Sequence, residues 1–391
     1  MRASDLRTVT AEARDAARNH RLRLAVIIPV FNNGELLRTR AFPSLVNSAY
    51  FAQMHILLID DGSTYTATRE AVTELAVAHP NVTAFFHPEG GSGSASRPRN
   101  TGLELAFTDY LTYLDPDDEM LDDGYWKLVE DLEAEPRAQF ALGDEITDRN
   151  GQQRLLPNRP HYGKLADAEG LIRLSKNALR RTGFRPTSIE AMVVRTQWLK
   201  EQKLQQVEGA AGQDTLFFLQ VLQAADVCLL RDEPVYIYYA DVAGSMVNAV
   251  GPGYFHKCLT LEKAQVKWLQ QEGLLQDYLE TRFEKFFVTW YLRQFSRVQP
   301  EHRQEVRSLL WEIACCYLSD PRAHRWQYPQ SMWFFRKPGL PSLEGLRPWA
   351  AQAKLRGSAA AGQARQLTEG ALTRAERLAS RIRSGGDQPE R

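Results

Sequence analysis

The sequence predicts an α/β fold in which a mostly parallel sheet is flanked by helices and followed by a C-terminal helical module. Between residues 24 and 142, short apolar runs alternate with amphipathic stretches, a pattern typical of strands joined by crossover helices. After Gly251-Pro252-Gly253 the apolar residues change to helical spacing. These two observations divide the chain into a sheet-forming part and a helical part.

The expected strands are short apolar runs bounded by turn residues. They lie at 24–31, 55–60, 82–86, 110–114, 139–142, 191–194, 227–230 and 235–239. Helical composition and spacing predict helices at 36–50, 66–78, 94–108 and 214–223, and one more at 171–179 within a polar excursion from 152 to 186. Such sheets bind ligands at the carboxyl ends of their strands, so functional residues are expected there.

The helical part carries apolar residues that recur on one helix face and are expected to form core. They are Phe283, Phe286, Phe287, Trp290 and Tyr291. We therefore expect four segments: a helical or flexible N-terminal segment at 1–22, the sheet domain at 23–250, the helical module at 251–340, and an amphipathic or disordered tail at 341–391.

Composition excludes several classes of protein. The 391 residues contain 48 Lys and Arg against 48 Asp and Glu, so no basic excess favours nucleic acid as a partner. No apolar run approaches the ~20 residues of a membrane-spanning helix, and the N-terminus lacks the apolar core of a secretory signal. The four cysteines show no spacing typical of a zinc site. These features predict a cytoplasmic protein.

The strongest functional signal is an acidic run directly after an expected strand, Asp115-Pro116-Asp117-Asp118-Glu119. Closely spaced carboxylates are hard oxygen ligands that suit Mg²⁺ or Mn²⁺. An acidic turn before a helix would show the same residues, because Asp and Pro both favour such turns. The run by itself leaves both interpretations open.

Two neighbouring segments add polar groups at the same edge of the sheet. The second strand ends in Asp60, which is followed by a turn containing Gly62. A Gly/Ser loop at 90–94 leads into Arg97 and Arg99, whose guanidinium groups suit an anionic phosphate. The alternative for the segment at Asp60 is a helix cap with a turn glycine, and the alternative for the Gly/Ser loop is a solvated linker with surface arginines. The loop is not a P-loop, because no Gly-Lys-Ser/Thr follows it.

A fourth segment, Gly209-Ala210-Ala211-Gly212-Gln213-Asp214, delivers one carboxylate to the start of an apolar helix. In isolation Asp214 is best explained as a helix cap. Together with the three preceding segments, it is a candidate general base directed into a cleft.

Taken together, the motifs resemble those of family 2 glycosyltransferases, which have the Rossmann-like GT-A fold. The resemblance covers about residues 24 to 239. The matching segments are Ile28-Pro29-Val30-Phe31-Asn32, Ile59-Asp60-Asp61-Gly62-Ser63, Arg99-Asn100-Thr101-Gly102, Leu114-Asp115-Pro116-Asp117-Asp118 and Gly212-Gln213-Asp214.

The resemblance implies a metal-dependent inverting transfer of a sugar from a nucleotide sugar, most often a UDP-sugar, to a hydroxyl. The metal, Mn²⁺ or Mg²⁺, would be held by Asp117 together with Asp115, and Asp214 would deprotonate the acceptor. The implied donor-binding residues are Pro29, Phe31, Asn32, Asp60, Arg99, Asn100 and Asp115.

The sequence departs from the family pattern at two positions. Gln213 stands where the family often has Glu, and Pro98 stands where a small residue is usual. Transmembrane helices and the QxxRW motif of processive synthases are missing from the sequence. The alternatives are a catalytically inactive scaffold or glycan-binding protein that kept the fold, and a sugar nucleotidyltransferase, for which the first turn lacks the usual glycines.

The resemblance to bacterial cell-envelope enzymes implies a glycan, teichoic acid or other polyol-phosphate acceptor. The helical module is a candidate dimerisation surface. Aromatic and basic residues near its end suggest peripheral contact with the inner face of the membrane, but ordinary packing against the helical module explains them better. They are Trp326, Trp333, Phe334, Phe335, Arg336 and Lys337.

Overall fold

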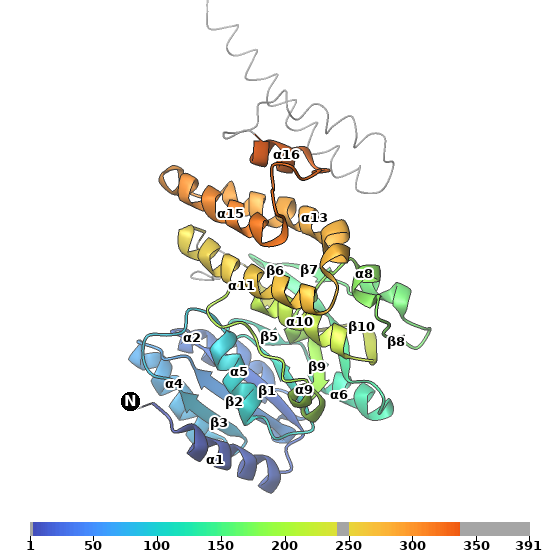
Figure 1. The fold of residues 1–391 in the computed structure, drawn as a ribbon. Coiled ribbons are helices and arrows are strands. Elements are labelled where there is room, and N and C mark those ends of the chain that lie inside the picture. The colour runs from blue at the N-terminus through green and yellow to red at the C-terminus, as the bar shows by residue number, and fades with distance from the viewer. Residues whose placement is uncertain (1–2, 241–249, 337–391) are drawn as a thin grey trace, which may run out of the picture. The chain divides into compact units, whose positions relative to one another are not determined.

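The computed structural model describes residues 3–240 and 250–336, and its sheet has ten strands (Figure 1). The expected tail at 341–391 lies outside the described residues. The strands are β1 Leu24–Val30, β2 Met54–Asp60, β3 Val82–Phe86, β4 Tyr110–Tyr113, β5 Glu119–Met120, β6 Phe140–Arg149, β7 Gln152–Leu156, β8 Leu171–Arg173, β9 Met192–Arg195 and β10 Val227–Tyr239.

The helices alternate with these strands up to β10 and then continue without further strands among the described residues. They are α1 Leu6–Asn19, α2 Gly34–Leu36, α3 Phe42–Val46, α4 Thr66–Ala78, α5 Ser96–Leu105, α6 Gly124–Ala134, α7 Arg159–Tyr162, α8 Ala178–Thr182, α9 Thr196–Glu201, α10 Gln213–Ala224, α11 Pro252–Gln271, α12 Leu275–Tyr278, α13 Glu284–Phe286, α14 Arg293–Phe295, α15 Arg303–Tyr317 and α16 Pro329–Arg336. Single π-helical turns join α2 to α3 at Leu37–Ala41, α12 to α13 at Leu279–Phe283 and α13 to α14 at Phe287–Leu292, and 3₁₀ turns lie at Phe51–Gln53, Gly163–Leu165, Ile189–Ala191 and Pro300–His302.

The strand order is β3-β2-β1-β4-β9-β6-β10-β5, with β7 beside β6 and β8 beside β10. Strands β3, β2, β1 and β4 are parallel, as the alternation of strands and helices predicts. Strand β9 runs antiparallel between β4 and β6, so the complete sheet is mixed. Because of this reversal, the amino end of β9 lies at the edge where β4 and β6, its two neighbours, present their carboxyl ends.

Two local expectations need correction. The predicted helix at 171–179 begins instead as strand β8, which pairs with β10, and only α8 is helical. Residues 227–239 form one strand rather than two, with the irregular register near Pro234 absorbed as a bulge. Both errors arise because pairing with distant strands overrides local composition.

The core of the sheet lies on its two faces. On one face, alternate residues of β1 and β2 pack against helices α3, α4 and α6 in one large apolar cluster. On the other face, helix α5 crosses β1 so closely that a side chain at Gly102 would lie 2.3 Å from a methyl carbon of Ile27. The sheet edge that carries the functional residues is therefore fixed by packing on both sides.

His55 lies on β2, fully buried, and its Nε2 is 2.9 Å from the Thr83 hydroxyl. Burial, with a smaller contribution from His20, lowers its pKa to about 4. The folded state therefore resists protonation that the unfolded chain accepts below about pH 6.5.

We expect stability to fall by about 3 kcal/mol from this group as the pH drops from 6.5 towards 4. A His55→Gln variant, which keeps a partner for Thr83, should lose less stability over this interval in urea unfolding. The exposed His302→Gln serves as the control. An equal loss of stability in wild type and His55→Gln would contradict the prediction.

The chain forms two compact units. The first comprises Met1–Phe283 and Gln294–Tyr317, and the second comprises Glu284–Arg293 and the residues from Leu318 onward. Within the second unit, Phe287, Trp326 and Phe335 are buried, and the rings of Trp326 and Phe335 stack with centroids 4.4 Å apart. The aromatic residues that favoured membrane contact are thus engaged in packing here, with Phe334 also buried. None of the described helices is long and apolar enough to span a membrane.

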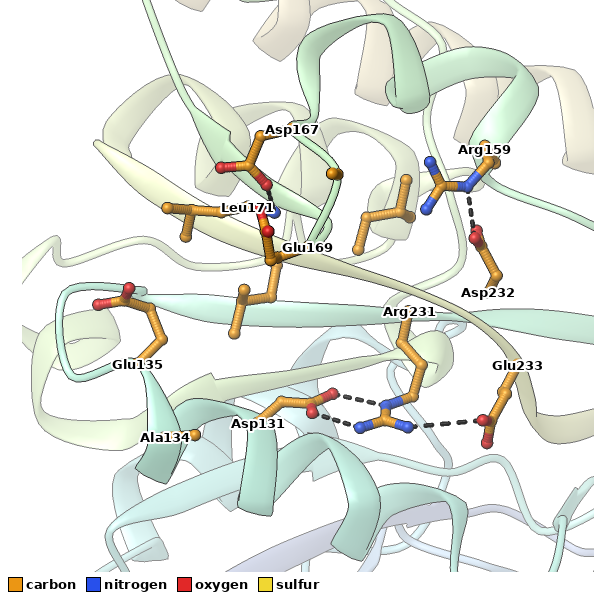
Figure 2. Close-up of a pocket in the computed structure, with 13 residues that line it drawn as sticks. Asp131, Ala134, Glu135, Arg159, Asp167, Glu169, Leu171, Arg231, Asp232 and Glu233 are labelled. Atoms are coloured by element: carbon orange, nitrogen blue, oxygen red, sulfur yellow. Dashed lines mark hydrogen bonds and ion pairs between the residues drawn. The ribbon is translucent and has the colours of Figure 1, made fainter.

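A pocket of about 580 Å³ lies beside β8, the end of α6 and the middle of β10 (Figure 2). Two arginines that line it form ion pairs: Arg231 with Asp131 and Glu233, and Arg159 with Asp232. None of the motif residues identified in the sequence lines this pocket.

Candidate active site

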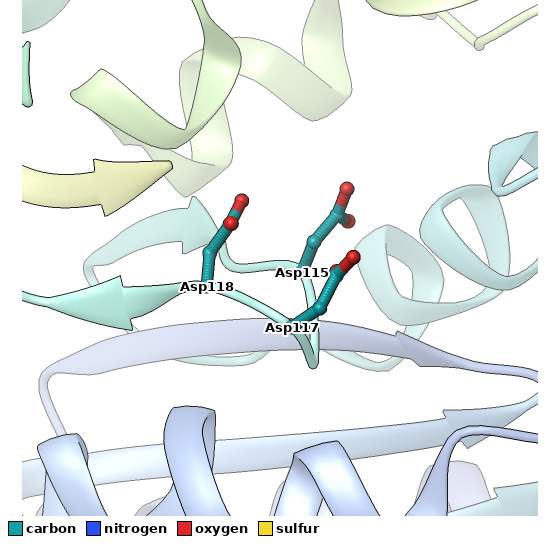
Figure 3. A group of neighbouring side chains, drawn as sticks. All are labelled: Asp115, Asp117 and Asp118. Atoms are coloured by element: carbon teal, nitrogen blue, oxygen red, sulfur yellow. The ribbon is translucent and has the colours of Figure 1, made fainter. Parts of the chain in front are cut away.

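The acidic run forms a turn after β4 in which three carboxylates come together. Ligand atoms of Asp115, Asp117 and Asp118 all lie within 4.8 Å of one another. Figure 3 shows the three side chains projecting to the same side of the turn. Three hard oxygen donors at this spacing fit a divalent cation such as Mg²⁺ or Mn²⁺.

Electrostatics supports the same interpretation. Burial and the neighbouring Asp115 raise the pKa of Asp117 to about 6. Burial, followed by the charge of Glu190, raises the pKa of Asp118 well above its usual range. The cluster therefore carries mutual repulsion that a cation would relieve.

Two contacts hold the turn in place. Arg40 donates from Nη1 to the backbone oxygen of Asp117 at 3.0 Å, and the backbone N–H of Tyr239 donates to Asp118 Oδ1 at 2.9 Å. The Arg40 guanidinium also lies over the Tyr239 ring, 4.1 Å from its centroid. Arg40 is carried by the π-helical turn Leu37–Ala41, and such turns are frequent at functional sites.

Asp60 ends β2 and is fully buried. Its Oδ1 accepts hydrogen bonds from the backbone N–H groups of Gly62 at 3.0 Å and Ser63 at 2.9 Å. Its Oδ2 has no hydrogen-bond partner among the described residues, although it is buried. Gly62 has φ of 83°, and a Cβ there would lie 2.0 Å from the oxygen of Pro88, so the turn requires glycine. One oxygen of Asp60 thus builds the turn, and the other is a buried acceptor whose partner is still to be explained.

The first strand delivers one exposed ring to this edge. Pro29 is buried within β1, whereas Phe31 is 43% exposed. Asn32 has φ of 57°, and its Oδ1 accepts from the backbone of Thr64 and Tyr65 at 2.9 and 3.0 Å. Asn32 therefore holds the turn at Thr64 and Tyr65, and Phe31 presents an aromatic face.

The Gly/Ser loop is held by Asp61. Ser92 donates to Asp61 Oδ2 from its backbone N–H at 2.7 Å and from its hydroxyl at 2.8 Å, and Arg97 Nε donates to Oδ1 at 2.8 Å. A Cβ at Gly91 would lie 2.7 Å from the Phe31 ring, so the loop passes directly beside that ring. Arg97, expected near a phosphate, is instead paired with a buried carboxylate.

Arg99 is buried between two carboxylates. Its Nη2 donates to Asp115 Oδ1 at 2.5 Å and to Glu190 Oε1 at 2.7 Å. Glu190 was not predicted from the sequence. It lies in the 3₁₀ turn that precedes β9, and the antiparallel direction of β9 brings it to the site. The only local signal is a charged residue placed directly before an apolar run.

Asn100 bonds to a different segment of the chain. Its amide pairs with the backbone of Gln206, donating to the oxygen at 2.9 Å and accepting from the N–H at 2.8 Å. The side chain therefore fixes the segment that leads to Asp214. The family resemblance places Asn100 beside the donor, and in the structure its amide is bonded to the backbone of Gln206.

Asp214 lies in the first turn of α10, partly exposed. The helix cap is Gly212, with φ of 81°, so Asp214 is not the N-cap residue. Burial and then Asp115 raise the pKa of Glu190 well above its usual range, and Asp214 adds to this rise. The charge of Asp214 therefore acts on Glu190, which shares the Arg99 guanidinium with Asp115.

Helix α11 supports the Asp214 loop. The oxygen of Lys257 accepts from the backbone N–H of Ala211 at 3.3 Å, and Lys257 Nζ donates to the oxygen of Gly93 at 2.5 Å. Leu261 on α11 packs with Ala210 and Leu216. The first helix of the C-terminal part thus joins the Gly/Ser loop to the loop that carries Asp214.

The fold and the site together define an α/β protein with a candidate divalent-metal centre at the carboxyl edge of its sheet. Residues 25–187 match the model of Glycosyl transferase family 2. This match agrees with the resemblance seen in the sequence.

Several curated proteins are similar to the chain. The Staphylococcus aureus poly(ribitol-phosphate) beta-N-acetylglucosaminyltransferase TarP is 34% identical over 25% of this chain and 28% of its own length. The Rhizobium meliloti succinoglycan biosynthesis protein ExoW is 23% identical over 81% of this chain and 95% of its own. An uncharacterised Haemophilus influenzae glycosyltransferase is 35% identical over 26% of this chain. The chain spans 38% and 28% of the first two relatives it matches.

Among solved structures, Staphylococcus aureus TarS residues 1–349 in complex with UDP-GlcNAc superposes with a TM-score of 0.59 at 18% identity. The match covers 76% of this chain and 82% of TarS 1–349. This likeness confirms the predicted GT-A fold.

Proposed function

We propose that the protein is an inverting glycosyltransferase that moves a sugar from a nucleotide sugar, with a UDP-sugar as donor, to a hydroxyl acceptor in the presence of Mn²⁺ or Mg²⁺. The observation that carries the proposal is the Asp115, Asp117 and Asp118 cluster within a family 2 domain. Asp60 at the end of β2 and Asp214 in the first turn of α10 are the residues proposed to supply the further groups that the reaction needs.

The proposed roles follow from the contacts. Phe31 stacks on the nucleobase, and the buried Asp60 Oδ2 accepts its N–H. Asp117 and Asp115 hold the cation, which when bound offsets charge on the leaving diphosphate. Pro29, Asn32, Arg99 and Asn100 keep these groups in position.

The chemical step uses Asp214. Its carboxylate accepts the proton of the acceptor hydroxyl, and the acceptor oxygen bonds to the anomeric carbon while the bond from that carbon to the diphosphate oxygen breaks. The nucleoside diphosphate leaves from the opposite face, so the configuration of the sugar inverts. Alignment of the two reactants contributes further to the rate.

The acceptor is proposed from the relatives alone. TarP is named for poly(ribitol-phosphate) and ExoW for succinoglycan, both polymers, so a cell-envelope glycan or polyol-phosphate is the acceptor class to test first. Nucleotide sugars are cytoplasmic metabolites, and the cytoplasm, including the inner face of the membrane, is the proposed location. Size-exclusion chromatography with light scattering tests the proposed self-association through the helical module.

A panel of nucleotide sugars assayed with Mn²⁺ or Mg²⁺ tests the proposal. Transfer to an acceptor, or slow hydrolysis of one donor, is the expected result. The proposal would be contradicted if the protein bound no UDP in the presence of Mn²⁺ and turned over no nucleotide sugar. Glycan binding without turnover would favour an inactive scaffold, and formation of a nucleotide sugar from a sugar phosphate and a nucleoside triphosphate would favour a nucleotidyltransferase.

The Phe31→Ala variant is expected to weaken UDP binding by roughly 5- to 150-fold, because stacking on a base contributes about 1–3 kcal/mol. The ring is 43% exposed, so thermal stability should change little. Isothermal titration with UDP measures the effect, and the highly exposed Val77→Ala on α4 is the control. Equal UDP affinity in wild type and Phe31→Ala would show that the base binds elsewhere.

A further inference from the structure

Glu190 is a buried carboxylate at the site to which the proposed reaction gives no part. Its side chain is 11% exposed, and its position at the amino end of β9 is fixed by the sheet. The turn that carries it packs against β4, β6, β10 and α10. A charge buried there is expensive unless it is paired, so its contacts should reveal its role.

Both oxygens of Glu190 already have partners. Oε1 accepts from Arg99 Nη2 at 2.7 Å, and Oε2 accepts from the Ser188 hydroxyl at 2.7 Å. The backbone N–H of Glu190 in turn donates to Ser188 Oγ at 3.1 Å. These bonds orient the carboxylate towards Arg99 and leave it poorly placed to ligate a cation.

Arg99 connects Glu190 to the carboxylate cluster. The same nitrogen, Nη2, donates to Glu190 Oε1 and to Asp115 Oδ1, so its two protons are divided between the two carboxylates. The Arg99 side chain is 3% exposed, so bulk solvent has little access to these protons. Without Glu190 the guanidinium would be balanced by Asp115 alone, and it would compete more strongly for the oxygens that a cation needs.

We infer that Glu190 is a positioning residue that acts through Arg99 to keep Asp115 available to the divalent cation. The inference rests on the proposed function, in which Asp115 and Asp117 hold Mn²⁺ or Mg²⁺. Removal of a group that hydrogen-bonds to a metal ligand, without binding the metal itself, typically weakens metal binding by about 10- to 100-fold.

The test measures Mn²⁺ affinity directly, from the electron paramagnetic resonance signal of free Mn²⁺ in titrations of the full chain. Glu190→Ala is expected to raise the Mn²⁺ Kd by about 10- to 100-fold. Glu190→Gln keeps an acceptor for Arg99 and should recover part of this loss. Glu262→Gln removes another buried carboxylate, which accepts from Gln265 and Tyr317, and should leave the Mn²⁺ Kd unchanged.

A second comparison tests the route through Arg99. In an Arg99→Met background, Glu190→Ala should have little further effect on Mn²⁺ affinity, because the connection is already broken. Thermal unfolding identifies any variant that fails to fold, and Glu190→Gln then carries the comparison. Where transfer is measurable, saturating Mn²⁺ should restore most of the activity lost in Glu190→Ala.

The outcomes separate the inference from the proposed function. The inference would be overturned by an unchanged Mn²⁺ Kd in both folded Glu190 variants. It would also be overturned if Glu190→Ala changed the Mn²⁺ Kd equally in the wild-type and Arg99→Met backgrounds, or if the wild type bound no Mn²⁺. A wild type that binds Mn²⁺ through this arrangement but transfers no sugar would overturn the proposed function and leave the role of Glu190 standing.

Discussion

Replacement of Asp214 by Asn is expected to lower the rate of sugar transfer by about 10²- to 10⁴-fold, the usual contribution of a general base. The amide has nearly the same size and can remain in the first turn of α10, but it cannot accept the acceptor's proton. Because Gly212 is the helix cap, loss of the carboxylate should change stability little. UDP and Mn²⁺ binding should persist, since neither depends on this group.

Single-turnover transfer and UDP titration with the same protein preparation separate the two effects. Glu208→Gln, an exposed position in the same loop, is the matched control and should keep wild-type activity. Full transfer activity in Asp214→Asn would remove this residue from the chemical step. A parallel loss of UDP affinity would instead indicate a fault in the fold of the loop.

The parallel half of the sheet and its polar strand ends could be predicted because both depend on local pattern. Apolar runs alternating with helices define β1 to β4, and the two acidic runs, which begin at Asp60 and Asp115, lie at the carboxyl ends of β2 and β4. The carboxylates of Asp60 and Asp115 were therefore expected at one edge. The direction of β9 relative to its neighbours could not be predicted, because a four-residue strand of this composition is compatible with parallel and antiparallel pairing alike.

That missing direction explains why Glu190 was overlooked. Functional residues of a parallel sheet are expected directly after its strands. Glu190 instead precedes β9, and it reaches the site because β9 is antiparallel to β4 and β6. Partner choice is equally invisible in the sequence. Arg97 and Arg99 look alike as loop cations, yet Arg97 pairs with Asp61 and Arg99 bridges Asp115 and Glu190. The partner of each arginine depends on contacts between segments far apart in the chain, and the sequence alone does not show these contacts.

The second large effect is expected at Asp117, where metal binding and stability should respond in opposite directions. With a folded-state pKa of about 6, raised first by burial and then by Asp115, this carboxyl binds its proton more tightly than the unfolded chain does. Its stabilising contribution is therefore present below about pH 4 and is lost as the pH rises through 6. Without metal, Asp117→Asn should be more stable than wild type at pH 8, by on the order of 1–2 kcal/mol after allowance for solvent screening.

Addition of Mn²⁺ should reverse this order. The wild type gains stability as the cation binds, whereas Asp117→Asn lacks one ligand and should gain little. Sugar transfer by the variant should fall at least about 100-fold, because charge on the leaving diphosphate is no longer offset. Urea unfolding at pH 8 and pH 4, with and without Mn²⁺, measures the stability terms, and Asp122→Asn in the loop after β5 is the control. If Mn²⁺ stabilises the wild type and Asp117→Asn equally, the cation binds away from Asp117. If the stability difference between the two proteins is the same at pH 8 and pH 4, Asp117 is not the carboxyl whose pKa is raised in the folded state.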